Sequence, residues 1–308
     1  MADQNQITNN TKTDKVAYSF SVGYLRFNII TDSTIELNEQ NTLDFGNSLC
    51  INPLETSVKI QIKTRTSFIE PELFVANSSD EFYGQNIWKA YKVNGHYTYS
   101  IDFINHSDFE QIIFKYDREK AKIDLFLTPT QSNNPTSINP FLHPLGVLMV
   151  SAIIMSSNGF LIHASGVKDG ENGYLFTGVS GIGKSTMATI WAKNGAEVIN
   201  DDRLIIYKED QGYRFANTPM PHYNDHSKQA PLKAIFLLTQ SKENYCNKIT
   251  GAQALSKVMA NFIQQLFDKE LVEKHLEKTM DLVMQVPIYE LGFKPDDDIV
   301  ALIRSLKL

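Results

Sequence analysis

Eight consecutive residues, Gly178 to Ser185, have the types and the spacing that a phosphate group requires. They read Gly-Val-Ser-Gly-Ile-Gly-Lys-Ser and fit G-x-x-x-x-G-K-[ST], the Walker A pattern of P-loop proteins. The glycines permit positive φ angles and a close approach of the backbone to a ligand. The Lys184 ammonium suits the outer phosphates of a nucleotide, and the Ser185 hydroxyl suits Mg²⁺. The sequence therefore predicts a site for ATP and Mg²⁺.

The segments on either side of this loop strengthen the prediction. Residues 173–177 form a short apolar run, which predicts a buried strand, and residues 186–193 predict a helix that stops at Gly195. Strand, loop and helix in this order place the loop N–H groups and the helix N-terminus around an anion. A glycine-rich turn with a chance Lys-Ser is the alternative. The residues expected to bind the nucleotide are Gly178, Val179, Ser180, Gly181, Ile182, Gly183, Lys184, Ser185 and Thr186.

Two carboxylates follow at the distance that a β-α-β unit requires. Residues 197–200 predict the next strand, which leads into Asp201, Asp202 and Arg203. Acidic residues beside a phosphate loop can hold Mg²⁺ or accept a proton from a hydroxyl group, and a cation relieves the repulsion between them. We assign Asp202 to the metal together with Ser185, and Asp201 to the proton, although the spacing alone does not separate the two roles. A solvated acidic turn is the alternative.

A histidine precedes the loop. His163 lies in a segment, residues 160–167, that predicts a strand, and a turn over residues 168–173 connects it to the strand before the loop. If the two strands pair, His163 comes close to the loop and can orient or tune the catalytic carboxylate. Arg203 is expected to neutralise charge on the transferred group. A histidine that only packs in the core is the alternative for His163.

The run from Tyr174 to Tyr207 resembles the catalytic domain of the HPr kinase/phosphorylase family. In that family a phosphate loop, a helix and an Asp-Asp-Arg segment occur in this order and spacing, and a histidine stands upstream, where His163 stands here. The wider group has the phosphoenolpyruvate carboxykinase-like nucleotide-binding fold. The resemblance extends well over residues 158–207 and loosely over the rest of the C-terminal half. It implies an ATP-dependent kinase that phosphorylates a hydroxyl, and it implies a homo-oligomer.

The sequence also departs from that family. Thr186 stands where HPr kinases tend to carry Glu, and their later segment associated with phosphorolysis has no counterpart. These departures favour the HPr-kinase-related small kinases, some of which are linked to peptide modification or to free serine. The acceptor stays open between a peptide, a carrier protein and a small hydroxyl compound. A carboxykinase-like enzyme and a nucleotide-binding regulator or scaffold without turnover are the alternative functions.

Composition limits the partners of the protein. The chain has 308 residues and a net charge of −6, with no basic run that could follow a nucleic-acid backbone. Cys50 and Cys246 lie far apart, which fits a reducing compartment. The most apolar stretch, residues 145–155, is too short to span a bilayer, and residues 1–14 lack the apolar core of a signal peptide. We therefore expect a cytoplasmic protein without nucleic-acid or membrane partners.

Four segments are expected along the chain. Residues 1–15 predict a disordered tail. Residues 16–128 alternate with period two and predict a β-rich antiparallel domain, whereas residues 129–138 are polar, contain proline and predict a linker. Residues 139–308 predict an α/β P-loop domain of the HPr kinase/phosphoenolpyruvate carboxykinase type.

Two segments of the C-terminal half carry further expectations. The loop from Thr218 to His226 is expected to close over the acceptor, with His222, Tyr223 or His226 in contact with it. Residues 251–282 have apolar residues at helical spacing and predict one long helix.

Overall fold

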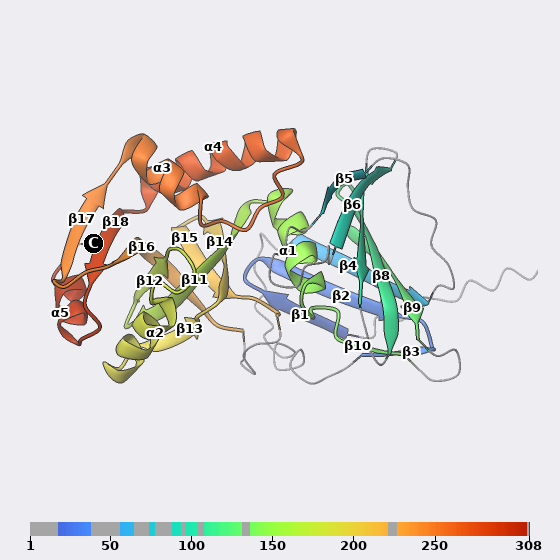
Figure 1. The fold of residues 1–308 in the computed structure, drawn as a ribbon, viewed down its shortest axis with the longest axis horizontal. Helices are drawn as coiled ribbons and strands as arrows, with labels where there is room; N and C mark the ends of the chain where they lie inside the picture. The colour runs from blue at the N-terminus through green and yellow to red at the C-terminus, as the bar shows by residue number, and fades with distance from the viewer. Residues whose placement is uncertain are drawn as a thin grey trace, which may run out of the picture.

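The computed structural model describes residues 18–37, 56–64, 74–77, 88–93, 96–103, 108–130, 136–220, 227–306 and 308. The described residues form two eight-stranded sheets, a short two-stranded sheet and five helices (Figure 1). A mixed α/β fold is thus confirmed. The predicted tail, Cys50 and the loop residues His222, Tyr223 and His226 lie outside the described residues.

The first sheet contains most of the N-terminal half. Its strand order is β1-β2-β4-β9-β8-β7-β6-β5, and β3 pairs with β10 in the two-stranded sheet. The strands are β1 (Tyr18–Val22), β2 (Leu25–Thr31), β3 (Ile35–Leu37), β4 (Thr56–Thr64), β5 (Phe74–Asn77), β6 (Trp88–Val93), β7 (His96–Asp102), β8 (Phe109–Asp117), β9 (Lys122–Pro129) and β10 (Thr136–Ile138).

The prediction of a wholly antiparallel sheet is wrong, because β4 runs parallel to both of its neighbours, β2 and β9. The alternation along a strand shows which face is buried, but it does not show the direction of the neighbouring strand. Parallel neighbours need a long connection. The chain provides one in residues 32–55 between β2 and β4, and another in β5 to β8 between β4 and β9.

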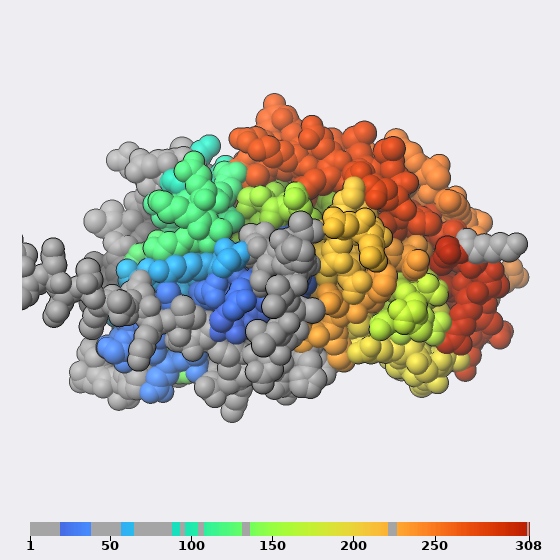
Figure 2. Space-filling view, turned by 180° about the vertical axis from the view of Figure 1, so that it is seen from behind, coloured from blue at the N-terminus to red at the C-terminus, as the bar shows by residue number. Residues whose placement is uncertain are grey.

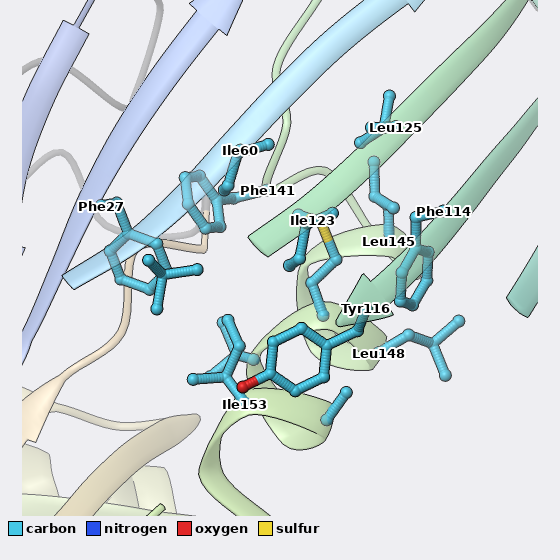
Figure 3. Close-up of a cluster of buried hydrophobic side chains, with 14 of the residues drawn as sticks. Phe27, Ile60, Phe114, Tyr116, Ile123, Leu125, Phe141, Leu145, Leu148 and Ile153 are labelled. Carbon is cyan, nitrogen blue, oxygen red and sulfur yellow. The ribbon is translucent and has the colours of Figure 1, made fainter. Parts of the chain in front are cut away.

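Helix α1 (Leu145–Met155) lies between the two sheets (Figure 1). Its almost continuous apolar sequence leaves nearly every side chain buried. Leu145, Leu148 and Ile153 belong to the same apolar cluster as Phe27 and Tyr116 of the first sheet (Figure 3). Residues of the second sheet, Leu161, Ile205 and Tyr207, complete that cluster. The helix therefore joins the two halves, and the domain division at residues 129–138 stays a prediction.

The second sheet contains the C-terminal half. Its order is β12-β11-β14-β15-β16-β18-β17, while β13 also pairs with β11 and β12 also pairs with β16. The strands predicted before and after the glycine loop are confirmed. The strands are β11 (Gly159–Asp169), β12 (Asn172–Thr177), β13 (Glu197–Asn200), β14 (Arg203–Glu209), β15 (Gly212–Asn217), β16 (Gln229–Gln240), β17 (Tyr245–Ile249) and β18 (Ile288–Phe293).

Four helices pack on this second sheet. Helices α2 (Lys184–Lys193) and α5 (Asp298–Arg304) share one apolar cluster with it, and α3 (Gly251–Met259) and α4 (Lys269–Gln285) share another. From behind, α4 lies along the upper edge of the molecule and reaches toward the first sheet (Figure 2). None of the helices in the described part of the chain is long and apolar enough to cross a membrane.

The prediction of one helix over residues 251–282 is wrong, because the chain leaves the helix after Met259 and starts a new one at Lys269. The segment between them pairs with β11, where the Ile263 amide donates to the Leu161 carbonyl at 2.7 Å. The Asp268 side chain then caps α4 by accepting from the Leu271 amide at 3.1 Å. Apolar spacing continues through this break, so the periodicity alone did not reveal it.

Candidate functional site

The glycine loop, residues Gly178–Ser185, connects the end of β12 to the start of α2. Gly181 and Gly183 have φ angles of 76° and 117°, which side chains with a Cβ rarely adopt. A Cβ on Gly183 would lie only 2.5 Å from Cζ of Phe293. The ring of Phe293 is buried, so glycine is required here both for the backbone conformation and for packing on β18.

Lys184 is buried beneath this loop. Its ammonium donates to the carbonyl oxygens of Gly178 at 3.0 Å and Val179 at 3.1 Å. Burial lowers the pKa of Lys184, and the Asp202 carboxylate acts in the opposite direction. The loop therefore encloses a positive charge that its own carbonyl groups hold in place.

The first turn of α2 faces an open cavity. Its N-cap residue, Gly183, has no side chain to accept from the N–H groups of that turn. Ser185 and Thr186 are exposed and line the cavity together with Gly183. Because the first N–H groups of a helix have no partner within the helix, this end of α2 attracts anions.

The acidic residues lie at a corner between β13 and β14. The Asn200 side-chain oxygen accepts from the backbone amides of Asp202 at 2.8 Å and Arg203 at 3.1 Å. This Asx-type turn fixes the backbone of the corner. Asn200 itself is buried at the end of β13, so the turn is anchored in the sheet.

Strand β11 brings the acidic corner and the glycine loop close together, because it pairs with the strands next to both. The first half of β11 pairs with β14, with His163 opposite Arg203, and its second half pairs with β12, with Ala164 opposite Thr177. The Ala164 amide also donates to the Asp202 carbonyl at 3.0 Å. Thr177 directly precedes the glycine loop. The loop therefore begins beside Ala164 on one edge of β11, and the acidic corner lies beside the neighbouring His163 on the other edge.

His163 lies beside Asp202. Its Nε2 atom is 3.5 Å from Oδ1 of Asp202, while the other oxygen of this carboxylate pairs with Arg203. Burial, and then the Lys184 ammonium, lower the pKa of His163, and Asp202 opposes them. The neutral form of His163 is therefore favoured at neutral pH. It was expected to tune the carboxylate assigned to the proton, Asp201, but it is Asp202 that lies within 3.5 Å of its ring.

Asp201 carries the other carboxylate of the corner. Its Oδ1 atom is buried and has no hydrogen-bond partner among the described residues. A buried carboxylate oxygen without a partner is costly, so this oxygen can accept a hydrogen bond from a ligand or bind a cation. The structure thus distinguishes the two aspartates: Asp202 is held by Arg203, whereas Asp201 keeps one oxygen unengaged.

These groups line one cavity of about 620 Å³, a volume suited to a small ligand. The predicted residues that line it are His163, Ser180, Gly181, Gly183, Lys184, Ser185, Thr186, Asp201, Asp202 and Arg203. Gly178, Val179 and Ile182 do not line it. The Val179 side chain is 73% exposed, and Ile182 packs against the apolar cluster under α2 and α5.

Three supporting residues were not predicted. Asn200 forms the turn described above. The buried Ser165 hydroxyl donates to the Lys184 carbonyl at 2.9 Å, and the buried Thr177 hydroxyl donates to the His163 carbonyl at 2.8 Å. Asn directly after a strand and before two aspartates is a turn signal that could have been noticed. The two hydroxyl bonds depend on strand pairing and have no local signal.

No protein-family model matches the chain, and no curated protein does. Among solved structures, it is similar to the HPr(Ser) kinase/phosphatase from Coxiella burnetii, with a TM-score of 0.30 and 14% sequence identity. That similarity covers 47% of this chain and 87% of the other.

Proposed function

We propose that the protein is an ATP-dependent kinase that transfers the γ-phosphate to a hydroxyl group. One observation carries the proposal: a glycine loop with a buried lysine and a carboxylate pair line the same cavity. Phosphoryl transfer requires positioning and charge stabilisation more than covalent chemistry, and these groups supply both.

The triphosphate would lie against the first turn of α2. The N–H groups of Gly183, Lys184 and Ser185 are at the positive end of the helix, and Lys184 would exchange its carbonyl partners for phosphate oxygens. Lys184 already lines the cavity, so its ammonium would not need to cross the loop to reach a phosphate there.

The oxygen atoms around the cavity fit Mg²⁺. No group of three or more His, Cys, Asp or Glu side chains in the described part of the chain could hold a metal by itself. Mg²⁺ does not need one, since it usually binds one or two protein oxygens together with phosphates and water. We assign Ser185 and Asp202 to the ion, because both line the cavity and Arg203 pairs with one oxygen of Asp202, Oδ2. When bound, the ion would neutralise charge on the phosphates.

Asp201 would accept the proton. In the transfer, the acceptor oxygen forms a bond to the γ-phosphorus, the bond from that phosphorus to the bridging oxygen of ADP breaks, and the hydroxyl proton passes to a carboxylate. The buried and unpartnered Oδ1 of Asp201 supports its assignment as this base. Arg203 would hold Asp202 in place and add positive charge to the cavity.

The test is transfer from γ-labelled ATP to free serine, to serine peptides and to HPr. Asp201→Asn should reduce turnover by about 10²–10⁴-fold while Mg·ATP still binds, because only the base is removed. Lys184→Met should instead weaken Mg·ATP binding. Lys193→Met, at the far end of the same helix, is the matched control and should change neither quantity.

Two outcomes would contradict the proposal. Tight Mg·ATP binding without transfer to any of these acceptors would favour a regulator or scaffold. Decarboxylation of oxaloacetate by the wild-type protein, lost in Lys184→Met, would favour a carboxykinase-like enzyme.

A further inference from the structure

Two cavities outside the glycine loop lie along helix α4. One, of about 680 Å³, is bordered by the end of α1, by α4 and by residues of the first sheet. The other, of about 590 Å³, is bordered by α4 and by the β14–β15 hairpin. They share Asn158, Glu277 and Lys278, and none of their lining residues also lines the cavity at the glycine loop. The two cavities therefore meet at these three side chains.

Lys278 is the cation at this junction. Its ammonium donates to the Ser157 carbonyl at 2.6 Å and lies 5.8 Å from the centre of the Phe160 ring. Within the described part of the chain, no carboxylate lies within ion-pair distance of it. The neighbouring cations do have such partners: Arg118 pairs with Asp268 at 3.1 Å, and Lys274 pairs with Glu270 at 2.7 Å.

An unpaired, partly desolvated ammonium is costly, and an anion that reaches it recovers that cost. Burial lowers the pKa of Lys278 to about 8, so the charged form still predominates at neutral pH. An ammonium has three N–H donors, and the Ser157 carbonyl occupies one of them. The other donors remain available at the point where the cavities meet. Asn158 is exposed at the same junction and adds a side-chain amide donor.

We propose that Lys278 and Asn158 bind the carboxylate group of a small molecule at this junction. A single negative charge fits the site better than the double charge of a phosphate ester. Among the described residues at this junction, Lys278 is the cation without an ion-pair partner. Glu119 and Glu277 line the first cavity and Asp210 lines the second, and these carboxylates would repel a dianion more strongly than a monoanion. This site is independent of the function proposed for the glycine loop.

The test uses the reactivity of Lys278. Only the neutral amine reacts with an amine-selective ester, and a bound carboxylate raises the pKa of its ammonium partner. At pH 8 about half of the amine is neutral, and a tenfold shift of its ionisation equilibrium toward the ammonium lowers the neutral fraction about fivefold. Saturating acetate or propionate should therefore slow labelling of Lys278 about fivefold, read by mass spectrometry, relative to sodium chloride at the same ionic strength. Labelling of Lys274, one turn away, should not change.

Variants separate the two binding groups. Asn158→Ala keeps Lys278 and should raise the acetate concentration needed for protection. Lys269→Met, at an exposed position of α4 that lines none of the three cavities, should leave it unchanged. Equal labelling of Lys278 with and without both carboxylates would overturn the proposal. Stronger protection by inorganic phosphate at equal ionic strength would overturn the assignment to a carboxylate. Because the main readout uses the wild-type chain, neither result depends on the folding of a variant.

Discussion

The Nε2 atom of His163 lies 3.5 Å from Oδ1 of Asp202, across the point where β11 and β14 are paired. A neighbouring carboxylate normally raises the pKa of a histidine. Here burial and the Lys184 ammonium outweigh it, and the pKa of His163 is lowered. The neutral form of the ring is therefore favoured at neutral pH, and the two side chains are in polar contact rather than in an ion pair.

The first prediction concerns the titration of His163. Its ring should take up a proton only below the ordinary pKa of 6.5, because the charged form is poorly solvated and faces Lys184. NMR titration of the histidine rings, with His163→Gln to identify the signal, measures this directly. A midpoint at or above 6.5 would mean that Asp202 dominates the environment of the ring.

The second prediction concerns His275, which is fully buried between Phe160 and Phe262 in the aromatic contact beneath α4. Neither ring nitrogen has a hydrogen-bond partner among the described residues. Burial, and then Lys278, lower its pKa from 6.5 to about 4. The unfolded chain therefore binds more protons between these values, and stability is lost as the pH falls through this window.

For His275 the loss between pH 7 and pH 5 should be about 2 kcal/mol. Urea denaturation at the two pH values measures it. His275→Phe keeps the aromatic packing but cannot titrate, so its unfolding free energy should fall by correspondingly less over the same range. An equal loss in this variant and in the parent would assign the pH dependence to other groups.

The third prediction compares two glycines of the loop. Gly181→Ala places a side chain at a positive φ in open space, and this conformation should cost about 1–2 kcal/mol. Gly183→Ala has the same kind of strain and also brings a Cβ to 2.5 Å from Phe293. It should therefore destabilise the protein more, as measured by chemical denaturation. Phe293→Leu should reduce the extra cost of Gly183→Ala, and no coupling between the two substitutions would argue against this contact.

Local signals were sufficient to predict the residues around the cavity. The glycine loop, the strand before it and the helix after it lie within about twenty consecutive residues. The local sequence pattern is therefore enough to predict how these three elements are arranged. The carboxylate pair directly follows one strand that the sequence indicates, and His163 lies within another. Ten of the predicted residues do line one cavity. The three that do not, Gly178, Val179 and Ile182, belong to the loop, whose side-chain directions depend on its φ angles.

Pairing between distant segments could not be predicted. The contact of His163 with Asp202 rather than Asp201 depends on the register of β11 with β14. The parallel neighbours of β4 depend on connections whose path has no local pattern. The interruption after Met259 depends on the bond between Ile263 and Leu161, which competes with continued helix. In each case, interactions with a segment far away in the sequence determine the local structure.

Strand β11 pairs with both β12 and β14, and this limits which changes in sequence the site can tolerate. Strand side chains alternate between faces, so one residue added between Phe160 and His163 would turn the imidazole to the opposite side and shift Ala164 away from the end of β12. Substitutions along β11 alter one contact at a time, whereas a change in its length would separate the histidine, the acidic corner and the glycine loop in a single step.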